Sequence, residues 1–155
     1  MAGTIDARLA ELDITLPEAT KPVANYVPYV RTGSLLFISG QGPFKNGEVA
    51  YKGKLGRDWT AEQGYEAARL TGTHILAQAR AALDGDLDRV VRIVKLVGFV
   101  SSVPEFTDQP KVINGCSDLM VEIFGDKGRH ARSAVATPVL PMDFAVEIEA
   151  IIEVA

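Results

Sequence analysis

Hydrophobic and polar residues alternate along the end of the chain, from Ala145 to Val154. A period of two places successive side chains on opposite faces of a strand. One face would hold Val146, Ile148, Ala150, Ile152 and Val154, and the other Glu147, Glu149, Ile151 and Glu153. The pattern therefore predicts a strand over 145–154 that buries one face and places Glu147 on the opposite face.

Three other segments have apolar residues at the spacing of a helix. The first runs from Thr60-Ala-Glu-Gln63, which has the pattern of a capping box, to about Leu83. The second runs from Asp108, its expected cap, to Gly125. The third is a short helix over Thr4–Leu12 with Thr4 as its cap.

Further strands are predicted over Tyr26–Arg31, Ser34–Ser39, Val91–Ser101 and Ala131–Ala136. Pro28 favours an edge position or a bulge for the first of these strands, because proline lacks the N–H that a central strand needs. The segment 91–101 is apolar on both faces, which is typical of a central strand. Gly40 to Trp59 has five glycines and little periodicity, so we expect a long loop there.

The elements follow the order α-ββ-α-β-α-ββ, which predicts an α+β fold with two helices on one face of a mixed sheet. The opposite sheet face also has apolar residues, including Ile151 and one side of 91–101. The sequence offers no third layer to cover them. We therefore expect another copy of the chain to cover this face, in a homo-oligomer.

Composition excludes several classes of protein and site. The length of 155 residues fits one domain, and the single cysteine, Cys116, excludes an intramolecular disulfide framework. No Cys or His pair has metal-ligand spacing, so we expect no metal site. The sequence has no signal-like or membrane-spanning stretch, so we expect a cytoplasmic protein without a membrane partner. The net charge of −4 argues against a broad nucleic-acid surface, although not against a local basic patch.

Two charged residues are the main candidates for chemistry. Arg132 lies in Arg129-His130-Ala131-Arg132-Ser133, and an arginine fork can donate two parallel hydrogen bonds to a carboxylate or phosphate. The alternative is that Arg129 and Arg132 are solvated surface charges. Glu147 lies on the expected inter-subunit face, where desolvation would raise its pKa toward neutrality. Its alternatives are a salt bridge or a solvated strand face.

Other candidates have structural explanations that compete with a functional one. Ser39-Gly40-Gln41-Gly42-Pro43 follows a predicted strand and could approach a ligand closely or be a simple turn. Cys116 is expected to be a buried thiol, and His74 a packed or surface histidine. Tyr51 and Trp59 could line a pocket or anchor the loop. His130 is the stronger histidine candidate because it lies among the arginines.

Several of these strings together resemble the YjgF/RidA family, formerly described as endoribonuclease L-PSP or translation-inhibitor proteins. The C-terminal motif is matched by Ala131-Arg132-Ser133-Ala134-Val135, Leu140-Pro141 and Val146-Glu147-Ile148-Glu149-Ala150. Ser39-Gly40-Gln41 is similar to the N-terminal motif, Lys95–Val100 to the central strand, and Asn114 to an asparagine on the second helix. The resemblance covers about Val23 to Val154. It implies a RidA-like domain at 23–155 and an N-terminal extension with a short helix at 1–22, as in a longer-chain branch.

The resemblance implies a chorismate-mutase-like fold that assembles as a homotrimer, with ligand clefts between subunits. It also implies hydrolysis of reactive 2-enamine or 2-imine intermediates to 2-keto acids and ammonia, without metal or organic cofactor. In that reaction Arg132 would bind the substrate carboxylate, and Glu147 would position or activate water. The cleft would be lined by Tyr26, Ser39, Gly40, Asn114 and the backbone of Ala134. Because Ala134 replaces a family cysteine, a thiol-dependent activity at that position is excluded.

Two other functions remain open at this level. The cleft could bind a small carboxylate metabolite without turnover, or the oligomer could act as a chaperone. Some family members are described as ribonucleases, and RNA cleavage could use His130 with Arg129 and Arg132. The acidic net charge offers no long phosphate-binding surface, which disfavours nucleic acid as a partner.

Overall fold

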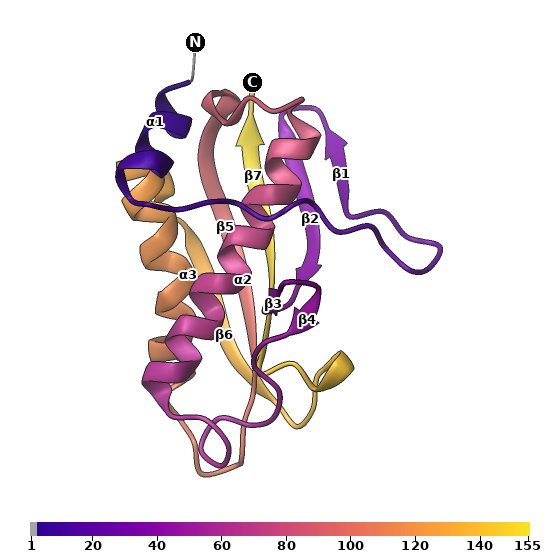
Figure 1. Cartoon of the computed structure of the whole chain (residues 1–155), viewed down its shortest axis with the longest axis vertical. Coiled ribbons are helices and arrows are strands. Elements are labelled where there is room, and N and C mark those ends of the chain that lie inside the picture. Colours follow the sequence, from indigo (N-terminus) through magenta and orange to yellow (C-terminus); the bar gives the residue numbers. More distant parts are fainter. Residues whose placement is uncertain (1–2) are drawn as a thin grey trace.

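Two long helices lie against one face of a five-stranded sheet in the computed structural model, which describes residues 3–155 (Figure 1). The helices are α2 (Ala61–Ala82) and α3 (Gln109–Phe124). The sheet consists, in spatial order, of β1 (Tyr29–Thr32), β2 (Leu35–Gln41), β7 (Val146–Val154), β5 (Val90–Ser101) and β6 (Ala131–Thr137). Only β5 and β6 are parallel; the other pairs are antiparallel. The predicted α+β architecture is confirmed.

Smaller elements connect and flank these layers. They are α1 (Thr4–Glu11), the hairpin of β3 (Phe44–Lys45) and β4 (Glu48–Val49), and the 3₁₀ turns η1 (Leu87–Arg89), η2 (Gly125–Gly128) and η3 (Pro141–Asp143). The extended segment after α1 crosses over α2 before it reaches β1 (Figure 1). None of the helices within residues 3–155 is long and apolar enough to span a bilayer.

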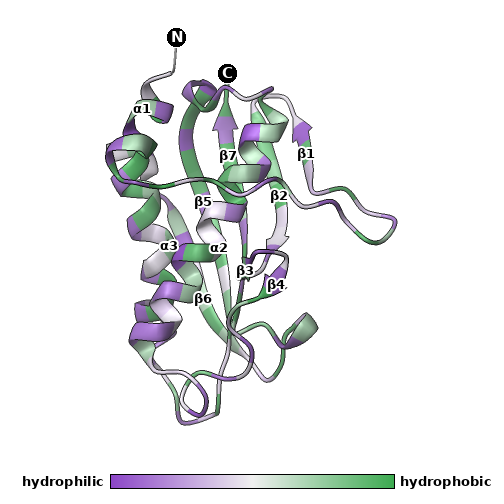
Figure 2. Cartoon of the chain, viewed as in Figure 1, coloured by the Kyte–Doolittle hydropathy of each residue, from purple (hydrophilic) through white to green (hydrophobic). Residues whose placement is uncertain are grey.

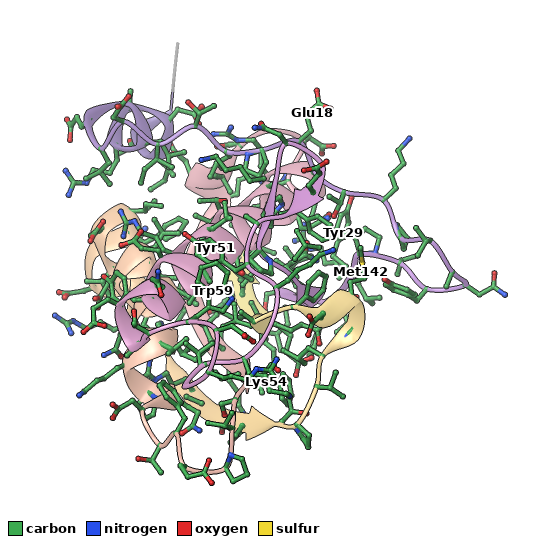
Figure 3. All side chains as sticks on the ribbon, turned by 60° about the horizontal axis from the view of Figure 1, so that its bottom comes forward. Glu18, Tyr29, Tyr51, Lys54, Trp59 and Met142 are labelled. Carbon is green, nitrogen blue, oxygen red and sulfur yellow. The ribbon has the colours of Figure 1, made fainter. Side chains whose placement is uncertain are left out.

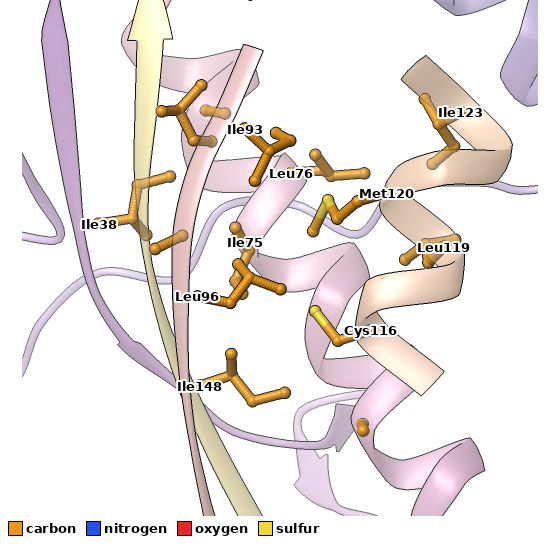
Figure 4. Close-up of a cluster of buried hydrophobic side chains, with 14 of the residues drawn as sticks. Ile38, Ile75, Leu76, Ile93, Leu96, Cys116, Leu119, Met120, Ile123 and Ile148 are labelled. Carbon is orange, nitrogen blue, oxygen red and sulfur yellow. The ribbon is translucent and has the colours of Figure 1, made fainter. Parts of the chain in front are cut away.

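The core lies between the sheet and the two helices (Figure 4). All five apolar residues on the predicted buried face of β7 are at most 3% exposed, which confirms the alternation. Hydrophobic and hydrophilic bands also alternate along β5 and β7 in Figure 2. Figure 4 shows the sheet side of the core, including Leu96 and Ile148, facing α2 at Ile75 and α3 at Cys116. The other sheet face is therefore left without a covering layer among the described residues.

The N-terminal caps of the three helices agree only in part with those that the sequence predicts. Thr60 and Gln63 form the predicted capping box, with hydrogen bonds of 3.2 Å and 2.9 Å between backbone N–H groups and side chains. Asp108 occupies the N-cap position of α3, but its side chain makes no capping bond. Thr4 is not the cap of α1, because the helix already includes it. The Asp88 carboxylate instead accepts hydrogen bonds from the N–H groups of Thr4 and Ile5.

Two further predictions, one of a strand and one of a loop, are also corrected. The strand predicted at 26–31 begins only at Tyr29, directly after Pro28, and it is an edge strand as expected. The loop predicted at 40–59 contains the β3–β4 hairpin, which turns at Asn46 and Gly47 with φ values of 53° and 79°. Asn-Gly is the usual pair for a two-residue hairpin turn, so the signal for this hairpin was present in the sequence.

We expect Gly115→Ala, in α3, to lower the free energy of unfolding more than Gly72→Ala, in α2, does. A Cβ at residue 115 would lie 1.9 Å from the carbonyl oxygen of Tyr65, so α2 and α3 would have to separate. The cost should be about 3 kcal/mol or more. Gly72→Ala is the matched control, because its Cβ would come closest to the side chains of Leu119 and Cys116, at 2.8 Å and 3.1 Å, and would meet the backbone only at 3.7 Å, an ordinary contact distance. Urea denaturation should give a much lower midpoint for Gly115→Ala, and equal midpoints would contradict the argument.

Candidate functional site

Arg132 is directed from the edge strand β6 toward α3. It pairs with Leu96 of β5 in the parallel register and is half-buried on the helix side of the sheet. Its Nη1 donates to Ser117 Oγ over 3.1 Å, and its Nη2 donates to the Pro110 carbonyl over 3.3 Å. Within residues 3–155, no carboxylate lies within 4.0 Å of its guanidinium. Arg132 is therefore a positioned cation without a counter-ion in this part of the chain.

The neighbouring arginine is different. Arg129 is exposed and pairs with Asp126 over 3.4 Å, so the alternative of a solvated surface charge applies to Arg129. It does not apply to Arg132. Strand alternation is also confirmed here, because Ser133 is exposed on the other sheet face while Arg132 is held by α3.

Asn114 and Ala134 lie on the same side of the sheet as Arg132. Pro110, Asn114 and Ser117 follow one another by four and three residues, so they share one face of α3. That face contacts Arg132 at both of its ends. Ala134 follows Arg132 by two residues on β6, opposite Gly98, and packs against the core. The structure thus brings together three of the predicted site residues, Arg132, Asn114 and Ala134.

Glu147 lies on the open face of the sheet, opposite to the helices. It pairs with Phe99 of β5 and is half-buried. Burial, followed by the nearby charge of Glu149, raises the pKa of Glu147. No cationic side chain within residues 3–155 lies within 4.0 Å of its carboxylate. The salt-bridge alternative therefore does not apply to this part of the chain.

Gly40 and Ser39 lie beside Glu147. A Cβ on Gly40 would be 3.0 Å from the Glu147 carboxyl carbon, so glycine at this position makes room for the acid itself. Ser39 donates its hydroxyl hydrogen to the Val27 carbonyl over 2.9 Å, and its N–H donates to Pro28. These bonds hold the segment that contains Tyr26 against β2, and the Tyr26 side chain is 54% exposed. Gly40 and Ser39 thus lie beside Glu147, and Tyr26 lies on the segment that Ser39 holds.

The two halves do not meet within one chain. Strand β5 lies between β6 and β7, which separates the strands of Arg132 and Glu147 by roughly 10 Å. The two side chains also lie on opposite faces of the sheet. Arg132 and Glu147 can therefore act on one small ligand only if they come from two copies of the chain.

The open face has the apolar character of a surface that another chain covers. Phe37, Val30 and Val135 are 41%, 53% and 44% exposed. A hollow of about 400 Å³ lies on this face, with Phe37, Val97 and Ile151 among its lining residues. Exposed apolar side chains that gather on one face of a sheet are typical of an interface.

The remaining candidates have structural roles. Cys116 is fully buried, and burial raises the pKa of its thiol to about 12, so it is not a nucleophile in the folded chain. His74 is buried against the β3–β4 hairpin, with Nε2 2.7 Å from the Phe44 carbonyl, and burial lowers its pKa. Tyr51 and Trp59 pack edge to face, with 5.1 Å between their ring centroids (Figure 3). Trp59 Nε1 donates to the Lys52 carbonyl. Both line a cleft under the segment 15–20, so they anchor the loop and line a pocket.

Ser117, whose hydroxyl accepts a hydrogen bond from Arg132, is not among the site residues that the sequence predicts. His130, the stronger histidine candidate from the sequence, has both ring nitrogens near protein atoms: its Nδ1 lies 2.6 Å from the Gly128 carbonyl and its Nε2 lies 2.8 Å from Ser117 Oγ. The spacing from Asn114 to Ser117 could have indicated a shared helix face. Within residues 3–155, no group of three or more His, Cys, Asp or Glu side chains is placed to hold a metal ion.

The chain is similar to known proteins along almost its whole length. The sequence profile of the family described as "YjgF/chorismate mutase-like, putative endoribonuclease" matches residues 6–153. Protein TCP17 of Trypanosoma cruzi is 46% identical over 153 residues, which cover 98% of this chain and 95% of that protein.

Two solved structures share the fold throughout. Protein Atu1372 of Agrobacterium tumefaciens has a TM-score of 0.92 at 49% identity, covering 97% of this chain and 92% of its own. A protein of Shewanella oneidensis MR-1, described as a "putative endoribonuclease", has a TM-score of 0.94 at 37% identity, covering 98% of this chain and 100% of its own. The fold is thus chorismate-mutase-like, as the sequence motifs implied.

Proposed function

Because the chain belongs to the YjgF/RidA family, we propose that it hydrolyses 2-enamine or 2-imine acids to 2-keto acids and ammonia. The observation that supports this proposal most strongly is a pair of unpartnered charges. Arg132 is a half-buried cation without a carboxylate, and Glu147 is a half-buried acid without a cation, among the described residues. Charges in such surroundings usually have a partner, which here would be the ligand.

The proposed chemistry needs only these two side chains and water. The Arg132 fork binds the substrate carboxylate and fixes the position of the C=N bond. Glu147 accepts a proton as water attacks the imine carbon. It then returns that proton to the nitrogen to give the carbinolamine. The same carboxylate next transfers the hydroxyl proton to the nitrogen as the C=O bond forms, so that the C–N bond breaks and ammonia leaves. The raised pKa of Glu147 suits a group that exchanges protons near neutral pH.

We further propose that the active assembly is a homotrimer with its sites between subunits. The exposed apolar residues of the open face would be buried by a second copy. The edge of β6, with Arg132, would then approach the Glu147 face of the neighbouring subunit. Both halves of the site, including Asn114 and Ala134 on one side and Tyr26, Ser39 and Gly40 on the other, would line one cleft.

The ribonuclease alternative has less support from the geometry. Its candidate acid–base group, His130, has both ring nitrogens within hydrogen-bond distance of protein atoms. Arg129, the second cation of that hypothesis, pairs with Asp126. Two freely titrating groups, which phosphodiester cleavage by general acid–base catalysis normally uses, are not assembled here.

The test is keto-acid and ammonia release from 2-imino acids made in situ by an amino-acid oxidase, with the spontaneous rate subtracted. Wild-type protein should accelerate release. Arg132→Ala should lose on the order of 2–5 kcal/mol of carboxylate recognition, roughly 30-fold to several thousandfold in kcat/KM. Arg129→Ala is the control, because it removes the same charge from an exposed neighbour. Saturable keto-acid binding without turnover would overturn the proposal in favour of a binding protein.

A further inference from the structure

The Arg132 guanidinium lies at the end of a chain of three hydrogen bonds. The chain runs from the Gly128 carbonyl through the His130 ring and the Ser117 hydroxyl to Arg132 Nη1, over 2.6, 2.8 and 3.1 Å. Gly128 is buried, and the three side chains are half-buried. Gly128 ends η2, His130 lies in the link to β6, Arg132 lies in β6, and Ser117 lies in the middle of α3.

The direction of each bond follows from the donors and acceptors available. A carbonyl oxygen only accepts, so His130 Nδ1 must have the hydrogen that points at Gly128. In the neutral ring Nε2 is then an acceptor, so the Ser117 hydroxyl donates to it. Arg132 has only donors, and therefore the remaining lone pairs of Ser117 Oγ accept from Nη1. Burial and the Arg132 charge both lower the pKa of His130, which favours this neutral ring.

The result is a guanidinium that is oriented before any ligand binds. Of the five N–H donors of Arg132, two contact α3, one at Ser117 and one at the Pro110 carbonyl. These two contacts fix the plane of the fork and leave the other donors for an anion. A bidentate grip depends on that plane, because both bonds to a carboxylate must form together.

We propose that Ser117 and His130 are positioning residues that hold the Arg132 fork in the orientation that binds a substrate carboxylate. This inference rests on the proposed function, in which Arg132 binds the substrate. Ser117 acts on the substrate through Arg132, and His130 acts through Ser117. In the absence of Ser117, the arginine would have to be ordered by the ligand itself, at a loss of affinity.

The test is a double-mutant cycle between Ser117 and Arg132, with two readouts. One readout is kcat and KM for imino-acid hydrolysis, and the other is calorimetric Kd for 2-oxobutanoate as a product probe. Ser117→Ala should raise KM and Kd roughly tenfold, the value of one hydrogen bond to a charged group, with kcat within about twofold of wild type. In the Arg132→Ala background the same change should have no further effect.

Two further variants separate positioning from general structural damage. Ser117→Thr keeps the hydroxyl and should restore a Kd near that of wild type. His130→Ala should weaken binding in the same direction and add nothing to Ser117→Ala. An equal Ser117→Ala effect in both arginine backgrounds would overturn the proposal, as would a failure of the threonine variant to bind better than alanine. A loss confined to kcat would do so too, since it would indicate that Ser117 takes part in the chemistry.

A ligand-free measurement distinguishes failure of this inference from failure of the proposed function. The ¹⁵N shifts of the His130 ring should show the Nδ1–H tautomer in wild type. The Arg132 side-chain N–H signals should be ordered in wild type and averaged in Ser117→Ala. If wild type neither binds nor turns over these acids but shows these signals, the proposed function fails and the positioning stands. If Arg132 is equally ordered without Ser117, the positioning fails whatever the activity.

Discussion

Arg132→Ala chains and Glu147→Gln chains, each with little activity alone, should recover about a quarter of wild-type turnover when they are co-assembled in equal amounts. The expectation follows from the sheet. Arg132 and Glu147 lie on opposite faces with β5 between their strands, so one chain cannot apply both to one small substrate. If each site takes its arginine from one copy and its acid from the next, random mixing pairs an intact arginine with an intact acid at one site in four.

The experiment uses co-expression of the two chains with the same affinity tag, so that homo-oligomers and mixed oligomers are purified together. Random assembly is checked by mass spectrometry of the intact complexes. A second mixture, wild type with the chain that has both substitutions, makes the test quantitative. Sites between chains again predict about a quarter of full activity, whereas sites within a chain predict about half. Absence of recovery in the first mixture together with half activity in the second would rule out the shared site.

Local sequence signals were sufficient for most of the fold. The alternation over 145–154 and the capping box at Thr60 depend on neighbours within a few residues, and the structure confirms both. The error at the start of α1 occurred where a distant residue determines the outcome. The first turn of α1 is capped by Asp88, which is 84 positions away from Thr4 in the chain. No local pattern at Thr4 contains that information.

The candidate site shows the same division. Residue types and motifs were enough to select Arg132 and Glu147, but not to predict which faces of the sheet they occupy relative to each other. Gly40 was expected to let a ligand approach the backbone, whereas the structure shows that its missing Cβ accommodates the Glu147 side chain. Ser117 is a single serine on a helix, and no local sequence pattern indicates a role for it. Its importance depends on two contacts, with His130 and Arg132, that only the packing of α3 on β6 creates.

Glu147→Gln should lower turnover on the order of 10²-fold or more while leaving the protein at least as stable as wild type at neutral pH. The reason is the desolvation that raises the pKa of Glu147 in the folded chain. For an acid whose folded pKa lies above its unfolded value, the stability present below the unfolded pKa is lost as pH rises through the folded pKa. The neutral glutamine avoids that loss. Urea denaturation should therefore show an advantage for Glu147→Gln at pH 8 that disappears near pH 4.

The pH profile of wild-type turnover tests the same carboxyl group independently. If Glu147 is the general base, kcat/KM should rise with pH across its raised pKa, so the acid limb should lie above the ordinary range of glutamate. Glu149→Gln is the matched variant, since Glu149 is the exposed acid two residues away whose charge helps to raise that pKa. It should keep activity and shift the acid limb to lower pH. An unchanged limb in Glu149→Gln, together with an active Glu147→Gln enzyme, would show that another group accepts the proton.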